Sequence, residues 1–236
     1  MRTRSYRLLA ATLCVAAVFG SAAPSRADRN ALWARVQRCV AEPKPPYRSC
    51  LLHNKPHQFV VLKDGAPSKT AAYLLLPDFK VPGIESPDVF VLPILNFWQF
   101  GWDEAAAYLK VPAYRIGLAV NSAVGRSQDQ LHMHLSCAAP KAVAALAAAH
   151  LTQHFQAAPF VEIGRKTYNA RLVDALTGKD SPFKLILEIP GAKEHMRDQT
   201  IAVIGARGGG YYVVQDFAHG SDDGVAEALL DETCTL

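Results

Sequence analysis

A short run of the chain, Gln130-Leu-His-Met-His-Leu-Ser136, alternates polar and apolar residues and contains two histidines. In a β-strand, successive side chains point to opposite faces, so the two leucines and the methionine would enter a core. The polar residues would then share the other face. The alternation therefore predicts a strand that places His132 and His134 side by side on one surface, with hydrogen-bonding neighbours.

Two neighbouring imidazoles are suited to chemistry on phosphorus. An unprotonated imidazole nitrogen is a competent nucleophile near neutral pH when an acceptor holds the other ring nitrogen. A second imidazole, two residues further on, can bind a phosphate or protonate the leaving oxygen. The polar turn over residues 121–129, directly before the strand, offers backbone amides and hydroxyls that can cradle phosphate oxygens.

The residue pattern alone leaves other interpretations of the histidines open. Both could be ordinary polar residues on a solvated strand face. A His-x-His pair also supplies two metal ligands, and His150 and His154, at helical i,i+4 spacing, could complete the site of a secreted metal-binding module. A two-histidine phosphoesterase is the third alternative, with His134-Leu-Ser136 and His219-Gly-Ser221 as its two motifs. The second motif lies in a Gly/Asp turn, which disfavours that class.

The first 27 residues differ in character from the rest of the chain. Three arginines precede an apolar run from Leu8 to Gly20, and small residues follow, as in a signal peptide. The run is shorter than the ~20 residues of a typical membrane-spanning helix, and an uncleaved signal anchor stays open. We therefore expect residues 1–27 to be a signal peptide or signal anchor. Residues 28–236 would form one domain, exported to the periplasm or held at the inner membrane.

Charge and composition disfavour other classes of protein. The chain has 25 Lys and Arg residues and 21 Asp and Glu residues. Because four of the arginines lie in the leader, the remaining body is formally neutral. Such a body lacks the basic excess of a nucleic-acid binder. Half of the residues are apolar, which predicts a globular body with its own core and not a disordered chain.

Four cysteines follow the leader: Cys39, Cys50, Cys137 and Cys234. An even number in an exported chain indicates disulfides, for which three pairings exist. The short separation favours Cys39–Cys50, and Cys137–Cys234 is then the second pair. Free buried thiols are the alternative, and the lack of a Cys-x-x-Cys pair disfavours zinc.

The elements that must position these residues follow from periodicity and turn signals. We expect helices over residues 30–40, 96–109, 140–155 and 223–230, and strands over 59–62, 70–76, 114–120, 130–137, 168–173, 200–206 and 211–216. Asp64-Gly65 and Gly208-Gly209-Gly210 indicate hairpin turns. The triple glycine lacks the Gly-Lys-Ser/Thr of a phosphate loop. The strand, helix, strand, strand order of the first half recurs weakly in the second half, which leaves an internal duplication open.

The segment from Ala119 to Cys137 closely resembles the histidine-triad signature of Asn, Gly-rich turn, Ser and His-hydrophobic-His-hydrophobic. Further motifs resemble the CDP-diacylglycerol pyrophosphatase branch of that superfamily. They are the Cys39/Cys50 pair, Phe59–Asp64, Leu75-Leu76-Pro77, Gly83–Pro87, Asn96-Phe97-Trp98, Gly125–Gln128 and the late Cys234. The resemblance spans the mature chain. It implies an α+β, HIT-like fold in which an antiparallel sheet with flanking helices carries the site.

The resemblance also implies an activity. It implies hydrolysis of the phosphoanhydride of CDP-diacylglycerol to CMP and phosphatidate through a nucleotidyl-histidine intermediate, without a metal or other cofactor. His132 would be the nucleophile, and His134 would contact the phosphate and the leaving group. Asn121, Gly125 and Ser127 would line the phosphate site. The partners implied are CDP-diacylglycerol and a membrane surface.

Three further residues complete the candidate substrate site. Gln130 stands where the triad has its first histidine, which supports the nucleophile and does not attack. We expect Gln130 to replace that histidine as a hydrogen-bonding residue. Lys63 and Arg126 are candidate ligands of a pyrophosphate, with surface solvation as the alternative for each.

Overall fold

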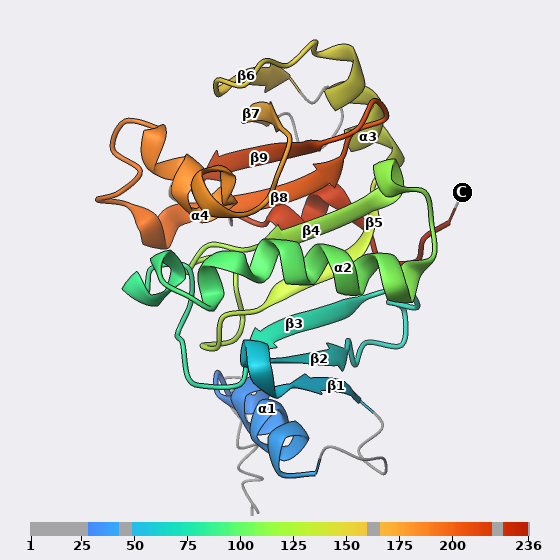
Figure 1. The fold of residues 1–236 in the computed structure, drawn as a ribbon, viewed down its shortest axis with the longest axis vertical. Helices are drawn as coiled ribbons and strands as arrows, with labels where there is room; N and C mark the ends of the chain where they lie inside the picture. The colour runs from blue at the N-terminus through green and yellow to red at the C-terminus, as the bar shows by residue number, and fades with distance from the viewer. Residues whose placement is uncertain (1–27, 43–48, 160–165, 219–223, 236) are drawn as a thin grey trace, which may run out of the picture.

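The computed structural model describes residues 28–42, 49–159, 166–218 and 224–235. Within these ranges the strands form one antiparallel sheet in the order β1-β2-β3-β5-β4-β8-β9-β7-β6, with β10 paired to β5 (Figure 1). The strands are β1 (Cys50–Asn54), β2 (Phe59–Lys63), β3 (Tyr73–Pro77), β4 (Ile116–Val120), β5 (Met133–Ala138), β6 (Gln156–Pro159), β7 (Thr167–Val173), β8 (Gln199–Gly205), β9 (Tyr211–Phe217) and β10 (Leu230–Asp231). The helices are α1 (Ala31–Ala41), α2 (Phe97–Leu109), α3 (Pro140–Ala148) and the short α4 (Pro182–Leu185). The fold is therefore α+β, as the sequence predicts.

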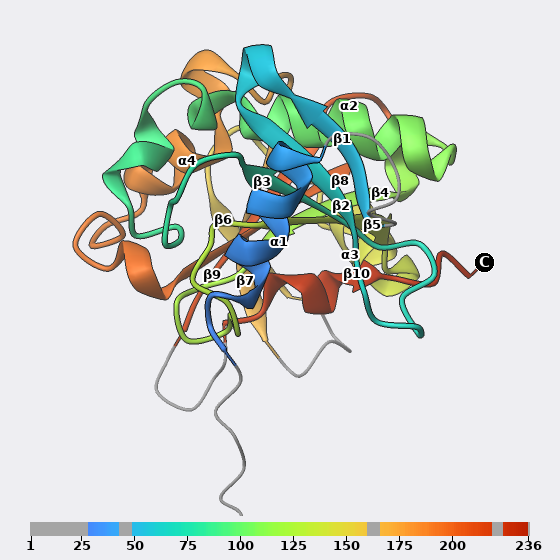
Figure 2. The same ribbon diagram turned by 90° about the horizontal axis from the view of Figure 1, so that it is seen from below.

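Helices cover both faces of this sheet. The apolar side chains of α2 and α4, among them Trp98 and Phe183, pack on the face that also receives Met133 and Leu135 of β5. On the opposite face α1 covers β2 and β3, while α3 and the 3-10 segment Ala226–Leu229 cover the middle of the sheet (Figure 2). The strand alternation predicted from the sequence thus separates a core side of β5 from a polar side.

The two halves of the sheet repeat one topology. In the first half, β2, β3, α2, β4 and β5 give the spatial order β2-β3-β5-β4. In the second half, β6, β7, α4, β8 and β9 give the order β6-β7-β9-β8. The halves meet at the antiparallel pair β4·β8, where Ala119 lies opposite Ala202. This two-fold arrangement supports the internal duplication that the element order left open.

Several expected elements differ from the structure. The helix expected over 140–155 ends at Ala148, because the chain turns at His150, whose φ is 47°. His150 and His154 therefore do not share a helical face, and the metal site built on that spacing was wrong. The expected closing helix is only the 3-10 segment Ala226–Leu229, which leads into β10. The sequence analysis also missed β1 and β6, two short strands without a clear alternation.

Two disulfides fasten the ends of the described chain to the sheet. Cys39 of α1 is bonded to Cys50 of β1, with 5.4 Å between the Cα atoms. Cys137 of β5 is bonded to Cys234 beyond β10, with 5.3 Å between the Cα atoms. Both are the pairs expected from the sequence, and such bonds persist in oxidising compartments.

The predicted leader, residues 1–27, lies outside the described residues. Within the described ranges, no helix has the length and apolar character needed to cross a membrane. Export and the fate of the leader therefore stay predictions.

Both disulfides should be present in protein prepared from an oxidising compartment, each adding ~2–4 kcal/mol to the free energy of unfolding. The Cys137–Cys234 bond should have the larger effect, since its sequence separation is 97 residues against 11 for Cys39–Cys50. Non-reducing peptide mapping tests the pairing, and denaturant unfolding of each double Cys→Ser variant tests the energies. Four free thiols would contradict the pairing and weaken the case for export.

Candidate active site

A pocket of about 450 Å³ opens on the polar side of β5, between α1 and the segment Ala226–Leu229. Its walls include both histidines of the strand motif and the turn that precedes them. Six of the eight residues proposed from the sequence for catalysis and substrate binding line it, namely Asn121, Gly125, Arg126, Ser127, His132 and His134. The structure thus brings together the five residues that the histidine-triad resemblance assigns to one site and adds Arg126, which was a candidate from its charge.

His132 is held in one tautomer by the main chain. Its Nδ1 lies 2.6 Å from the carbonyl oxygen of Gln130. A carbonyl oxygen can only accept a hydrogen bond, so Nδ1 carries the proton and Nε2 keeps its lone pair. Burial, the largest effect, and the neighbouring His134 lower the pKa of His132 to about 4. The ring is therefore neutral at pH 7, with Nε2 as a nucleophilic atom.

His134 lies two residues further along, with its ring centroid 5.1 Å from that of His132. Its position is fixed because it sits inside the sheet, between Leu74 of β3 and Ala119 of β4. Its Nε2 lies 2.8 Å from Oε2 of Glu227, a residue of the 3-10 segment near the end of the chain. The second histidine of the motif thus has a carboxylate partner from the other end of the fold.

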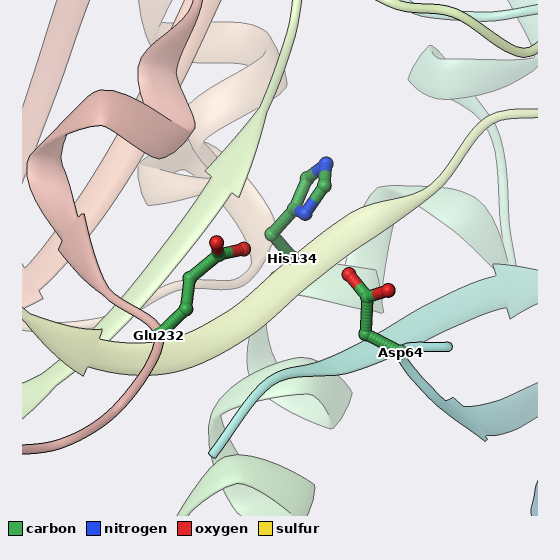
Figure 3. Close-up of side chains that lie close together, drawn as sticks. All are labelled: Asp64, His134 and Glu232. Atoms are coloured by element: carbon green, nitrogen blue, oxygen red, sulfur yellow. The ribbon is translucent and has the colours of Figure 1, made fainter. Parts of the chain in front are cut away.

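Other charged groups gather around His134 (Figure 3). Asp64, His134 and Glu232 each offer a ligand atom within 4.8 Å of the other two, a spacing that would suit a metal ion. However, Nζ of Lys69 lies 2.8 Å from Glu232 and 3.5 Å from Asp64. The Lys69 ammonium therefore supplies the positive charge that these two carboxylates require.

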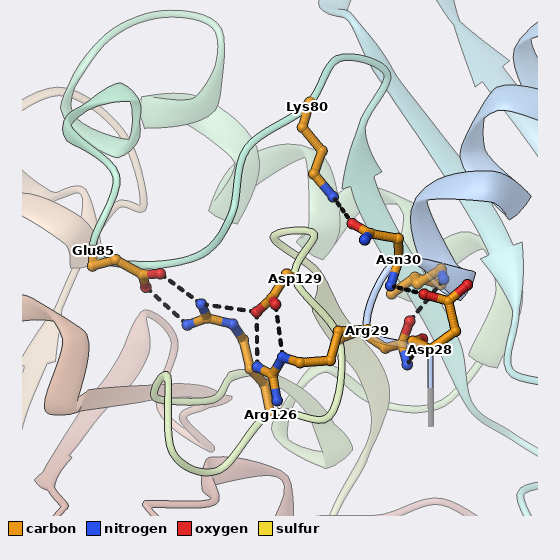
Figure 4. A network of polar contacts seen from close by, with 9 residues as sticks. Asp28, Arg29, Asn30, Lys80, Glu85, Arg126 and Asp129 are labelled. Carbon is orange, nitrogen blue, oxygen red and sulfur yellow. Dashed lines mark hydrogen bonds and ion pairs between the residues drawn. The ribbon is translucent and has the colours of Figure 1, made fainter. Parts of the chain in front are cut away.

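The turn before β5 is fastened by a buried guanidinium (Figure 4). Arg126 donates to both carboxylate oxygens of Glu85, one at 2.8 Å, and its side chain is 6% exposed. A Cβ at Gly83 would lie 2.4 Å from the guanidinium, so a larger residue there would displace it. Arg126 lines the pocket as the sequence suggested, but two carboxylates, Glu85 and Asp129, share its charge.

The start of the folded domain docks on the same turn. Arg29 binds both oxygens of Asp129 and accepts a hydrogen bond from the Asp129 amide at 2.7 Å through its own carbonyl. The amide of Leu32 donates to Oε1 of Gln128 at 2.8 Å. Ala31 and Leu32, a few residues after the predicted leader, are part of the pocket wall.

Gln130 does not act as expected, because its side chain does not line the pocket. Its amide donates to the carbonyls of Pro77 and Phe79 and accepts from the amide of Val81, so it holds the segment after β3. The expectation was wrong about the group involved, since the backbone carbonyl supports His132. The strand begins only at Met133, so strand alternation does not govern residue 130.

Lys63 is not among the residues that line the pocket, so the structure does not support its candidate role as a pyrophosphate ligand. Its Nζ donates to the carbonyls of Lys69, Thr70 and Ala72, and so closes the loop between β2 and β3. The cations that line the pocket in addition to Arg126 are Arg35 and Lys69. The sequence analysis missed Arg35, Lys69 and Glu227. They come from α1, the β2–β3 loop and the segment Ala226–Leu229, and only folding brings these distant segments to β5.

Comparison with known proteins shows the family of this chain. The family model described as CDP-diacylglycerol pyrophosphatase matches residues 27–236. A CDP-diacylglycerol pyrophosphatase from Yersinia pestis is 34% identical over 226 residues, which cover 89% of this chain and 85% of that protein. A solved HIT family hydrolase from Clostridium thermocellum is 17% identical, with a TM-score of 0.36, over 44% of this chain and 88% of that one. The chain therefore belongs to the CDP-diacylglycerol pyrophosphatase family and is a hydrolase.

Proposed function

We propose that the protein hydrolyses the phosphoanhydride of CDP-diacylglycerol to CMP and phosphatidate, with His132 as the nucleophile. The observation that carries the proposal is the state of His132. Its ring is neutral, its Nδ1 is bound to a carbonyl and it lies at the wall of a polar pocket. Membership of the family supports the choice of substrate.

In the first step, Nε2 of His132 attacks the phosphorus that bears cytidine. A P–N bond forms, and the bond from this phosphorus to the bridging oxygen breaks. Phosphatidate leaves as His134 gives a proton to the bridging oxygen. The product on the enzyme is a nucleotidyl-histidine, whose positive charge is stabilised by the hydrogen bond from Nδ1 to the Gln130 carbonyl.

In the second step, water attacks the same phosphorus and the P–N bond breaks. His134, now neutral, takes a proton from the water, which restores both histidines and releases CMP. Two steps are easier than one, because imidazole is a better nucleophile than water and a better leaving group than hydroxide. No metal takes part in either step of this proposal.

The turn before β5 is proposed to bind the phosphate oxygens. The amide of Gly125 already donates to the hydroxyl of Ser122 at 3.0 Å, so the Gly125 amide shapes the turn. Asn121 accepts from the amide of Glu227 through Oδ1, and its side chain also hydrogen-bonds the Glu227 carboxylate. Asn121 and Ser127 both line the pocket, and we assign the contacts with phosphate oxygens to these two side chains.

The protein is also proposed to act at a membrane surface after export. Its proposed substrate is a lipid, and its two disulfides fit an oxidising compartment. Because Arg29 and Leu32 are bound to the catalytic turn, a retained anchor would hold the site close to the membrane. A cleaved leader would leave a periplasmic enzyme with the same site.

Replacing His132 by Ala should lower kcat by several orders of magnitude, because it removes the nitrogen that forms the P–N bond. Replacing His134 by Ala should lower kcat by about 10²–10⁴, the range for loss of a general acid. The exposed His195, which lies near Asp198, provides a control, and His195→Ala should keep wild-type activity. CMP release from CDP-diacylglycerol in detergent micelles measures kcat. If His132→Ala kept more than about a tenth of wild-type kcat, a covalent role for this residue would be untenable.

The choice of phosphorus has its own test. If His132 attacks the cytidine-bearing phosphorus, the oxygen of water ends in CMP. Attack on the lipid-bearing phosphorus would form a phosphatidyl-histidine and place that oxygen in phosphatidate. Turnover in oxygen-18 water followed by mass analysis of both products distinguishes them, and we expect the label in CMP. Label chiefly in phosphatidate would overturn the assignment and leave His132 as a nucleophile toward the other phosphorus.

A further inference from the structure

Glu227 is in direct contact with the second histidine of the site. Its Oε2 lies 2.8 Å from Nε2 of His134, and its side chain is 28% exposed in the pocket wall. It comes from the segment Ala226–Leu229, which follows the second half of the sheet. The mechanism above asks His134 to deliver a proton, but a neutral imidazole could not do so. The group that keeps the proton on His134 therefore matters for the rate.

The charges around His134 single out Glu227 for this role. The ring is faced by Glu227 from the 3-10 segment, by Asp64 and Lys69 from the β2–β3 loop, by Glu232 from the chain end and by the His132 ring. Lys69 lies 2.8 Å from Glu232 and 3.5 Å from Asp64 and offsets their charge. His132 is neutral, so Glu227 is the carboxylate whose charge acts directly on the His134 ring.

Glu227 is also ionised across the working range of pH. Burial, the largest single influence, would raise the pKa of its carboxyl. The hydrogen bond and charge of His134, with the charge of Lys69, outweigh burial and lower that pKa to about 2. The residue is anchored as well, since its backbone amide donates to Asn121 at 3.3 Å. A fixed carboxylate at this distance stabilises a positively charged imidazole ring.

We propose that Glu227 is a positioning residue that keeps the proton on Nε2 of His134 and thereby sustains His134 as the general acid. This inference rests on the proposed function. The proton delivered to the bridging oxygen, as the bond to phosphatidate breaks, is the one on Nδ1 of His134, which has no hydrogen-bond partner among the described residues. It is replaced in the second step by a proton from the attacking water. Glu227 itself forms no bond to the substrate and stays a carboxylate throughout.

The experiment compares Glu227→Gln, Glu227→Asp and Glu232→Gln with the wild-type enzyme. Glu227→Gln keeps the size of the side chain but removes its charge, so the alkaline limb of kcat/KM should move to lower pH by about one unit or more. At pH 8 its kcat should fall at least about tenfold, with KM changed less. Glu227→Asp keeps the charge, so its alkaline limb should lie closer to that of the wild-type enzyme than the limb of Glu227→Gln does. Glu232→Gln removes an equal charge that Lys69 offsets, and should shift the limb far less.

Nitrogen-15 NMR of the histidine rings gives a second readout that needs no substrate. At pH 7 the protonated fraction of His134 should be lower in Glu227→Gln than in the wild-type enzyme. Unchanged protonation together with an unchanged alkaline limb would overturn the inference and leave Glu227 a structural residue. A shift of equal size in Glu232→Gln would also overturn it, because the protonation of His134 would then depend on the combined charge of the nearby carboxylates and not on the contact with Glu227. If the wild-type enzyme failed to hydrolyse CDP-diacylglycerol, the proposed function would fail while the NMR comparison still decided the role of Glu227.

Discussion

The hydrogen bond between Nδ1 of His132 and the carbonyl oxygen of Gln130 is the contact on which the rest of the site depends. At 2.6 Å it fixes the ring tautomer, and burial of the ring keeps that tautomer neutral. Together these constraints leave one nucleophilic atom, Nε2, at the wall of a polar pocket. A free histidine on a solvated strand would sample both tautomers and the protonated form, and would lack this orientation.

Much of the surrounding structure serves to hold that carbonyl and the strand that follows it. The side-chain amide of Gln130 is hydrogen-bonded to the backbone of Pro77, Phe79 and Val81, which restrains the position of residue 130 before β5. Beneath the strand, α2 approaches so closely that a Cβ on Gly101 would lie 2.6 Å from the sulfur of Met133. The catalytic strand is thus held by hydrogen bonds on one side and by close packing on the other.

The two halves share one topology but contribute different groups to the site. On β9, the strand that corresponds to β5, the positions on the face of His134 are Tyr212, Val214 and Asp216, so this strand carries no histidine there. The second half instead leads into the segment that brings Glu227 to His134. One half therefore supplies the nucleophile, and the chain beyond the other half supplies a carboxylate partner.

Sequence reasoning predicted those features that local patterns encode. The polar and apolar alternation predicted that His132 and His134 lie together, as they do, although β5 begins only at Met133. Cysteine parity with spacing gave the two pairs that the structure contains. Sequence reasoning did not find Glu227 or Lys69, because their contacts with β5 join segments distant in the sequence. It expected the side chains of Gln130 and Lys63 to belong to the substrate site. In the fold, each of these side chains instead donates hydrogen bonds to backbone carbonyls.

Nitrogen-15 NMR of His132 tests the central claim most directly, because the ring nitrogen shifts report tautomer and protonation state at once. We expect the Nδ1–H tautomer at pH 7, and a ring that stays mostly neutral down to about pH 5 because burial lowers its pKa to about 4. An Nε2–H tautomer, or a ring that becomes protonated with a midpoint near 6.5, would contradict the account. Either result would mean that the Gln130 carbonyl does not prepare His132 as a nucleophile.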